Sequence, residues 1–301
     1  MSTQTGNQAG EDRHVLRAGG ISAAVLAQGA ELCSLRDMEG HERLWQAGPL
    51  WPRHAPVLFP IIGRLPGDTL HHDGQDYHLG QHGLARDCRF TWLDRSDTVC
   101  RLVLEDSTQT RALYPFAFRL ELTFSLTEDS LEVHHRVSNP GNVVLPASLG
   151  GHPAFMWPTV PDAPRDAHRL LFAEPEPAPI RRISQGLLLP DTLPTPINGR
   201  ELLLRDSLFD ADAVILDHPA SRSVRFGAPG HPGLEVSWDG FHELGIWSKP
   251  GGAPFLCIEP WYGFTSPQDF KDDFVRKPGL MLIPPGENRE LSWRVKMLAE
   301  A

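Results

Sequence analysis

The stretch SLGGHPAFMWP places a lone histidine, His152, between a Gly–Gly pair and a proline, with two aromatic residues close behind. Imidazole is the side chain best suited to proton transfer near neutral pH. Gly150 and Gly151 allow either a bend in the chain or a close approach to the backbone. Pro153 fixes its own φ and has no amide hydrogen to donate. This segment therefore predicts an imidazole that the backbone holds in one position.

A single carboxylate, Glu259, follows an apolar run in the segment FLCIEPWYGF and precedes Pro260, Trp261 and Tyr262. The apolar run, residues 255–258, predicts a buried strand with Glu259 at its end. Burial raises the pKa of a carboxyl group. Glu259 would then be a useful proton acceptor near neutral pH.

Two segments near one another, WPRHAPVLFPIIGRL and QHGLARD, are rich in aromatic, imidazole and guanidinium groups. They contain Trp51, Arg53, His54, Arg64, His82 and Arg86. Aromatic rings can stack on the C–H faces of a sugar, while charged and imidazole groups bind its hydroxyls. Together with His152 and Glu259, these segments predict a carbohydrate pocket.

Each of these residues also has a purely structural interpretation. One histidine among fourteen is more often a hydrogen-bonded structural residue than a catalyst, and Glu259 alone could be a salt-bridge partner. Trp157 and Trp261 could belong to the core, and Arg64 and Arg86 could be surface charges. The combination favours function, because aromatic residues accompany His and Glu in segments that Gly or Pro constrains, and a site needs converging groups.

Alternating apolar and polar residues predict β-strands along most of the chain. Residues 120–126 and 131–137 alternate on either side of a turn at Glu128 and Asp129, which predicts an antiparallel hairpin. The C-terminus repeats this plan, with one strand in LMLIPP, a turn at GEN and a second strand over residues 291–297. Further short strands fit RLVLED, AVILDH and GIWSKP.

Helical periodicity is scarce, and the best helix candidate is residues 266–277, with Ser266 as the cap and Pro267 in the first position. Many short strands without βαβ alternation or internal repeats favour an all-β fold, a large antiparallel β-sandwich with few short helices. We expect one domain over residues 13–301, preceded by a flexible tail at residues 1–12.

Composition restricts the partners of this 301-residue chain. Its formal net charge of −10 argues against nucleic acid and anionic membranes, which need an excess of Lys and Arg. There is no apolar run long enough for a membrane span and no signal sequence. The four cysteines, Cys33, Cys88, Cys100 and Cys257, are scattered without a CxxC pair, as is typical of reduced thiols in a cytosolic protein.

These observations predict a cytoplasmic protein whose partner is a small molecule, a sugar or a sugar phosphate. We expect neither a metal nor a cofactor, because the sequence contains no cluster of metal ligands and no nucleotide-binding motif. Activity should therefore survive chelation. The sequence leaves open whether the chain forms a homodimer.

Six motifs, in the order PVLFPIIGRL, HGLAR, GGHPAF, LFDADAVIL, CIEPW and KPGLMLIPPGE, resemble the aldose 1-epimerase (galactose mutarotase) family. The similarity is greatest to the branch of LacX-like proteins and hexose-6-phosphate epimerases, and it covers roughly residues 15–298. The resemblance implies a single β-supersandwich domain. It also implies a cofactor-free interconversion of the α and β anomers of a sugar.

The resemblance also implies roles for individual residues. Glu259 matches the general base, which takes a proton from the anomeric hydroxyl, and His152 matches the general acid, which protonates the ring oxygen. His82 matches a second histidine near the ring oxygen, and Arg64 matches a sugar-binding arginine.

The sugar-binding aspartate of the family falls within LFDADAVIL, at Asp212, or at Asp210 if the local alignment slips. Arg86 and Trp261 are further candidates for substrate binding. The chain departs from galactose mutarotases at Gly63, where they have asparagine, and it has a shorter glycine-rich stretch after the matched second histidine. These departures put galactose as the preferred substrate in question.

Three alternatives accompany a mutarotase acting on an unphosphorylated sugar. The first is a hexose-6-phosphate 1-epimerase, in which Arg53, His54, Arg64 and Arg86 would clamp a phosphate. The second is a non-catalytic sugar-binding or sensing protein on the same fold. The third and weakest is a polysaccharide lyase or hydrolase domain. The presence of both an acid and a base favours an enzyme, because binding alone does not require the pair.

Overall fold

The computed structural model describes residues 12–301. Residues 1–11 of the predicted flexible tail lie outside this range. Asp12, the last residue of that prediction, is anchored, since its carbonyl accepts a 2.7 Å hydrogen bond from the Ala27 amide and its carboxylate pairs with Arg89. Asp12 is thus held by two contacts to the rest of the described chain.

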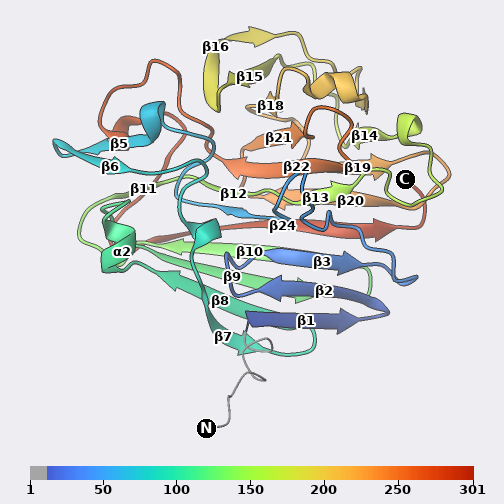
Figure 1. Cartoon of the computed structure of the whole chain (residues 1–301), viewed down its shortest axis with the longest axis horizontal. Coiled ribbons are helices and arrows are strands. Elements are labelled where there is room, and N and C mark those ends of the chain that lie inside the picture. Colours follow the sequence, from blue (N-terminus) through green and yellow to red (C-terminus); the bar gives the residue numbers. More distant parts are fainter. Residues whose placement is uncertain (1–11) are drawn as a thin grey trace.

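Two large sheets dominate the structure (Figure 1). In spatial order, the nine-stranded sheet contains β17 (Glu201–Leu203), β14 (Arg169–Phe172), β19 (Ser223–Gly227), β20 (Gly233–Asp239), β24 (Asn288–Leu298), β10 (Ser130–Ser138), β9 (Arg119–Leu126), β8 (Val99–Glu105) and β7 (Thr91–Arg95). The eight-stranded sheet contains β16 (Leu187–Leu193), β15 (Ile180–Ser184), β18 (Val214–Leu216), β21 (Glu243–Trp247), β22 (Phe255–Tyr262), β12 (Leu149–Gly151) and β4 (Val57–Leu58), and β13 (Ala154–Met156) also pairs with β22.

Smaller elements complete the fold. They are the sheet of β1 (Arg13–Ala18), β2 (Ile21–Leu26) and β3 (Leu32–Arg36), the pair β5 (Thr69–His72) and β6 (Gln75–His78), and the pair β11 (Leu145–Ala147) and β23 (Met281–Ile283). Among the elements that lie wholly within residues 12–301, the helical ones are α2 (Thr108–Arg111) and the 3-10 turns η1 (Pro66–Asp68), η2 (Ala85–Asp87), η3 (Arg165–Ala167), η4 (Asp206–Phe209) and η5 (Phe274–Arg276). No helix in residues 12–301 is long and apolar enough to cross a membrane.

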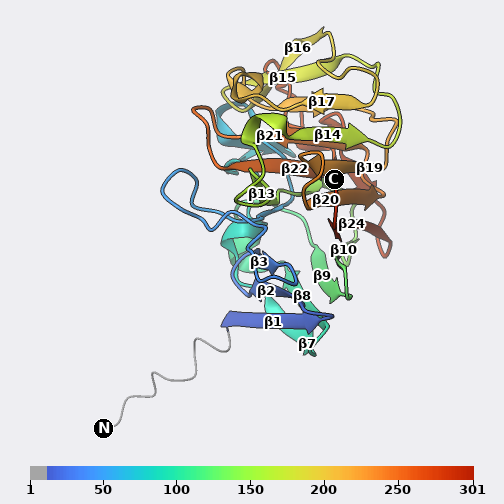
Figure 2. The ribbon, with the colours of Figure 1, turned by 90° about the vertical axis from the view of Figure 1, so that its right-hand side faces the viewer.

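The two large sheets face one another as the layers of a sandwich, and β1–β3 lie against the β7–β9 end of the nine-stranded sheet (Figure 2). Close contact between the layers is visible at Gly151 of β12, where a Cβ atom would come within 2.7 Å of the Trp293 indole nitrogen in β24. Every pairing between named strands is antiparallel. The predicted antiparallel β-sandwich is therefore confirmed.

The two predicted hairpins have different outcomes. The hairpin of β9 and β10 is confirmed, with Leu126 opposite Leu131 across the predicted turn. The C-terminal hairpin is wrong, although both of its strands exist. Strand β23 pairs with β11, whereas β24 lies between β10 and β20 in the nine-stranded sheet. Alternation identifies a strand, but the partner of that strand depends on the whole fold.

The predicted helix at residues 266–277 is also wrong, since only the 3-10 turn η5 forms there. The backbone of this segment bonds to β16 instead. The Leu188 amide donates to the Ser266 carbonyl at 2.9 Å, and the Gln268 amide donates to the Leu188 carbonyl at 3.3 Å. The bond from Leu188 occupies the Ser266 carbonyl, which would otherwise accept the first bond of a helix, so tertiary context overrides the capping signal.

Candidate active site

All seven site residues predicted from the sequence line one cavity of about 220 Å³ beside the eight-stranded sheet. They are Arg64, His82, Arg86, His152, Asp212, Glu259 and Trp261. Asp210 lies at a neighbouring hollow that Asp212 also lines, and Trp157 is buried in the core with 1% of its surface exposed. The cavity thus contains every predicted site residue, whereas Asp210 and Trp157, which the sequence could neither assign to the site nor exclude from it, do not line it.

Glu259 lies on β22 in the interior of the eight-stranded sheet, opposite Gly245 of β21. The strand continues through Tyr262, so Glu259 is within it and not at its end as predicted. The residue is 2% exposed, and burial raises the pKa of its carboxyl well above the usual value. The nearby Trp261 indole opposes this rise, and the charge of Asp212 adds to it. The predicted direction of the pKa is confirmed.

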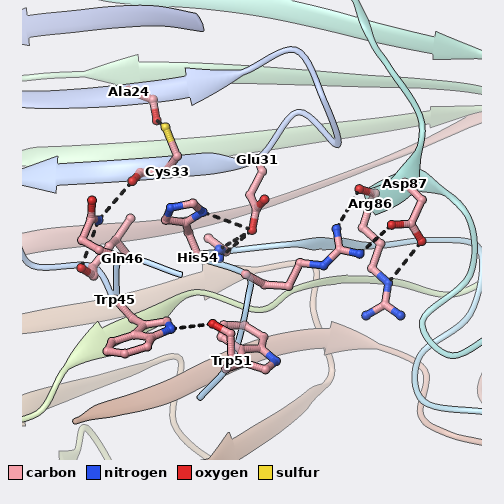
Figure 3. Close-up of polar contacts among 12 residues, drawn as sticks. Ala24, Glu31, Cys33, Trp45, Gln46, Trp51, His54, Arg86 and Asp87 are labelled. Atoms are coloured by element: carbon pink, nitrogen blue, oxygen red, sulfur yellow. Dashed lines mark hydrogen bonds and ion pairs between the residues drawn. The ribbon is translucent and has the colours of Figure 1, made fainter. Parts of the chain in front are cut away.

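His152 follows β12 directly and is enclosed by aromatic rings. The Trp51 ring lies 5.0 Å from it at an interplanar angle of 30°, and the Trp247 ring lies 5.9 Å away and nearly perpendicular. The Trp45 indole donates a 2.7 Å hydrogen bond to the Trp51 carbonyl, which fixes the loop that carries Trp51 (Figure 3). Burial, and then the charge of Arg86, lower the pKa of His152 to about 3. The imidazole is therefore neutral at neutral pH.

The carboxylate of Glu259 and the imidazole of His152 face one another, with 3.4 Å between Oε2 and Nε2. Within residues 12–301, Glu259 Oε2 and His152 Nδ1 are buried without a hydrogen-bond partner. Burial disfavours the charged form of both groups, so a protonated carboxyl beside a neutral imidazole is the favoured arrangement. The pair then carries one proton that it can give up or relocate.

His82 is held as a single tautomer by Gly63. The Gly63 amide donates a 3.1 Å hydrogen bond to His82 Nδ1, and the His82 amide donates a 2.7 Å bond to the Gly63 carbonyl. Burial and the charges of His152, Arg86 and Arg53 lower the pKa of His82 well below its usual value. A neutral imidazole that accepts at Nδ1 carries its hydrogen on Nε2. His82 can therefore donate a hydrogen bond from Nε2 to a ligand oxygen.

The backbone at Gly63 leaves no room for the asparagine found in galactose mutarotases. Gly63 has a left-handed φ of 63°, and a Cβ atom there would lie 2.2 Å from Thr265 Oγ1. The glycine that replaces the asparagine of galactose mutarotases is therefore required by the backbone conformation at residue 63 and by the nearby side chain of Thr265. The Thr265 side chain occupies the space that a side chain at residue 63 would need, and its hydroxyl accepts a 3.0 Å hydrogen bond from the Arg64 amide.

Glycines position the indole of Trp261 at the cavity. A Cβ atom at Gly245 would lie 2.4 Å from the Trp261 ring, and one at Gly150 would lie 2.6 Å from it. Gly150 and Gly151 belong to the extended strand β12. Of the two roles considered for this Gly–Gly pair, close approach to the backbone is therefore the one observed, and the approaching groups are the indoles of Trp261 and Trp293.

We expect Gly245→Ala to weaken ligand binding at this cavity by displacing Trp261, because the added methyl group cannot occupy the space of the indole. The Michaelis constant should rise by roughly tenfold, the cost of a 1–2 kcal/mol packing change. Measuring kcat and KM separately checks this expectation. Gly240→Ala, a turn position beside Leu291, is a control for a general loss of stability. Equal kinetic effects in both variants would contradict a local role for Gly245.

Asp212 reaches the cavity from the loop before β18, with a left-handed φ of 64°. Its Oδ1 accepts a 2.7 Å hydrogen bond from the following amide of Ala213, and its carbonyl accepts a 2.6 Å bond from Arg182. These bonds fix the loop and leave Oδ2 available to a hydroxyl group. Of the two aspartates proposed from the sequence, Asp212 has the position that suits a ligand in this cavity.

The two arginines of the cavity differ in their electrostatic environment. Arg64 donates from Nε to Asp68 Oδ1 at 2.8 Å and makes a second bond to the same carboxylate, which compensates its charge. The Arg86 guanidinium is 3.8 Å from Asp87, and its Nε is buried without a hydrogen bond among residues 12–301. Arg86 is therefore the more available cation for a ligand.

The other two members of the proposed phosphate clamp do not line the cavity. Arg53 donates a 2.6 Å hydrogen bond to Asp87, and His54 lies beside Glu31, which accepts a 2.7 Å bond from the His54 amide. Figure 3 shows Glu31 next to His54, and Arg86 next to Asp87. The structure thus brings together two of the four predicted groups.

Some lining residues were not among the predicted site residues. The sequence indicates Trp51 only as part of a segment rich in functional groups. It gives no sign that Trp247, Thr265, Gln81 and Gln185 line the site. Trp247 lies two residues after Gly245, on the strand that pairs with β22. Sequence could have indicated it only if the pairing of these two strands had been known.

The arrangement is that of a small-molecule site with a buried acid–base pair in an antiparallel β-sandwich. The sequence profile of the aldose 1-epimerase family matches residues 12–270 of the chain. The protein therefore belongs to the aldose 1-epimerase family.

Individual relatives agree with this assignment. The chain is 31% identical over 281 residues to the chromosomal protein LacX of Lactococcus lactis subsp. lactis, covering 90% of this chain and 94% of LacX. It is 29% identical to a galactose mutarotase related enzyme from Lactobacillus acidophilus, with a TM-score of 0.89 over 96% of this chain and 98% of that one. A galactose mutarotase-like protein from Lactobacillus casei is 30% identical, with a TM-score of 0.87 over 95% and 100% of the two chains.

Proposed function

We propose that the protein is an aldose 1-epimerase that interconverts the α and β anomers of an unphosphorylated hexose or a related sugar. The observation that carries the proposal is the 3.4 Å contact between Glu259 and His152 at a cavity lined by tryptophans and hydrogen-bonding groups. Membership of the family supports the same reaction class. Indole faces suit the C–H surfaces of a pyranose, and Asp212 and the two arginines suit its hydroxyls.

Ring opening requires a proton to leave the anomeric hydroxyl and another to reach the ring oxygen. In the proposed reaction Glu259 accepts the first proton and His152 donates the second, while the bond between C1 and the ring oxygen breaks. Rotation about the C1–C2 bond presents the other face of the aldehyde. The two transfers then run in reverse and close the ring as the opposite anomer. Each transfer by a positioned group is worth about 10²–10⁴-fold.

The protonation state of the pair fits this cycle. Opening starts from a carboxylate and an imidazolium and ends with a neutral carboxyl and a neutral imidazole. Burial favours that neutral arrangement, because it raises the pKa of Glu259 and lowers the pKa of His152. The cavity therefore stabilises the proton distribution that accompanies the open-chain sugar. No proton needs to be exchanged with solvent in a turnover.

The charges around the cavity favour an unphosphorylated sugar over a sugar phosphate. A phosphate dianion needs several uncompensated cations. Here Arg64 is paired with Asp68, Arg53 is paired with Asp87, and Asp212 contributes an acidic group. Arg86 alone is better suited to one or two hydroxyl oxygens.

An anomerisation assay by polarimetry or NMR tests the proposal directly. We expect the protein to accelerate mutarotation of freshly dissolved glucose or galactose, and to act less well on glucose 6-phosphate. Sugar binding without acceleration of any of the three would indicate a non-catalytic binding protein. Acceleration restricted to glucose 6-phosphate would indicate a hexose-6-phosphate epimerase.

Replacing Arg86 by glutamine should weaken binding of the neutral sugar and of its 6-phosphate by a similar factor, at least about tenfold. A hydrogen bond from a charged donor is worth about 1.5–3 kcal/mol. Isothermal titration with both ligands measures the two losses. Arg89→Gln is the matched control, since Arg89 follows in the same segment but pairs with Asp12 outside the cavity. A loss of affinity confined to the phosphorylated sugar would instead support the hypothesis that Arg86 binds a phosphate.

A further inference from the structure

A thiol lies behind the acid–base pair. Cys257 precedes Glu259 by two residues on β22, so both side chains point to the same face of the sheet. One ligand atom each from Cys257, His152 and Glu259 lies within 4.8 Å of the other two. All three residues are buried, with exposed fractions of 0%, 7% and 2%. The sequence gives no hint of this cluster, because His152 is distant along the chain.

The cluster has unused ligand capacity. Glu259 Oε2 is buried without a hydrogen-bond partner within residues 12–301, and it lies 3.4 Å from His152 Nε2. Such groups cost free energy unless something binds them. A metal ion would engage the carboxylate, the imidazole and the thiolate at once.

We propose that Cys257, His152 and Glu259 form an inhibitory site for a thiophilic divalent cation, zinc in the first place. A thiolate, an imidazole and a carboxylate are the ligand types that zinc prefers, whereas magnesium and calcium prefer oxygen ligands. The charges of a thiolate and a carboxylate balance the ion, which permits its burial.

The distances allow such a site after small movements. Zinc lies about 2.0–2.3 Å from its ligands, so ligand atoms in a tetrahedral site are roughly 3.5 Å apart. Shifts on the order of 1 Å would contract the present cluster to that size. His152 and Glu259 line the cavity while Cys257 lies behind them. A bound ion would thus have its remaining coordination position open to the cavity.

Binding would stop anomerisation, because the ion occupies the lone pairs that Glu259 and His152 need for proton transfer. This consequence rests on the proposed function, whereas the metal site itself does not. It also agrees with the expectation that activity survives chelation. A chelator should preserve the activity of the enzyme, and should raise it wherever zinc is present.

A second group of metal-ligand types, Asp37, Glu39 and His41, does not support a comparable inference. Asp37 is paired with Arg43 at 2.6 Å, and Glu39 and His41 are exposed. It also lacks a thiol, which provides a spectroscopic means to tell the two groups apart.

Cobalt is the probe that reports on the thiolate ligand. After treatment with a chelator and dialysis, the full-length protein should bind Co²⁺ with a thiolate-to-cobalt charge-transfer absorption in the near ultraviolet, and Zn²⁺ should abolish this band. The band should be absent in Cys257→Ala and retained in Cys100→Ala. Cys100 is the matched control, since it is also 0% exposed but lies on β8 in the other sheet. Should Cys257→Ala not fold, Cys257→Ser is used instead.

A kinetic experiment measures how strongly Zn²⁺ inhibits anomerisation, relative to the zinc-free rate of each variant. We expect competition with the sugar, reversal by chelation, and an inhibition constant at least about tenfold higher in Cys257→Ala, since even outer-shell changes cost 10–100-fold in metal affinity. No cobalt band, or a band that persists without Cys257, would overturn the site. A Cys257-dependent band in a protein without anomerase activity would keep the metal site and refute the proposed function.

Discussion

Replacing Glu259 by glutamine is expected to lower kcat for anomerisation by at least about 10²-fold, the lower range for one general base. Glutamine keeps the size of the side chain and can accept a hydrogen bond, but it cannot take up a proton at neutral pH. Sugar affinity should change much less. A fall in kcat with nearly constant affinity marks an interaction that is made mainly in the transition state.

The same substitution should not destabilise the protein at neutral pH. Burial raises the pKa of Glu259 in the folded state, so the folded protein binds more protons than the unfolded chain above the ordinary carboxyl pKa. The contribution of Glu259 to stability is therefore full at low pH and is lost as the pH rises. Glutamine does not titrate, so the melting temperature of the variant should improve relative to the parent as the pH rises above the ordinary carboxyl pKa of 4.5.

Glu176 provides the matched control for this prediction. It is also 2% exposed, but its carboxylate accepts hydrogen bonds from the amides of Ala220 and Ser221 at 2.9 and 2.8 Å, and it does not line the cavity. Glu176→Gln should lower the melting temperature and leave kcat within about twofold, because it loses charged hydrogen bonds only. A Glu259→Gln protein that anomerises sugars at the parent rate would refute the proposed mechanism.

The sequence was most informative where local pattern and chemistry coincide. Alternation over residues 120–137 is sufficient for the β9–β10 hairpin, because its strands are adjacent in the chain. Glu259 and His152 could be identified because an apolar run or a Gly–Gly pair distinguishes each from the other acidic and histidine residues. Family resemblance supplied their roles, and the structure then brought both to one cavity.

Features that depend on strand pairing and tertiary contacts could not be predicted. The position of Trp247 at the cavity, the small size of Gly245 under Trp261 and the approach of Cys257 to His152 all require the register of β21, β22 and β13. The helix predicted after Ser266 failed for the same reason, since backbone bonds to β16 replace helical ones. Local propensity does not reveal which distant strand will supply these partners.

The final prediction concerns His152, the partner of Glu259. His152→Asn should lower kcat by at least about 10²-fold, because the amide cannot deliver a proton to the ring oxygen. His135→Asn is the matched control. The His135 imidazole is also buried, with its pKa lowered to about 3, but it lies in β10 of the other sheet. With rates normalised to folded protein, that variant should retain kcat.

The double variant Glu259→Gln, His152→Asn separates a coupled pair from two independent contributions. If the two groups exchange protons with the same sugar in one step, removing the second should cost little once the first is gone. The combined loss in kcat should therefore be well below the product of the two single losses. Multiplicative losses would show that the groups act independently, although only 3.4 Å separates Glu259 Oε2 from His152 Nε2.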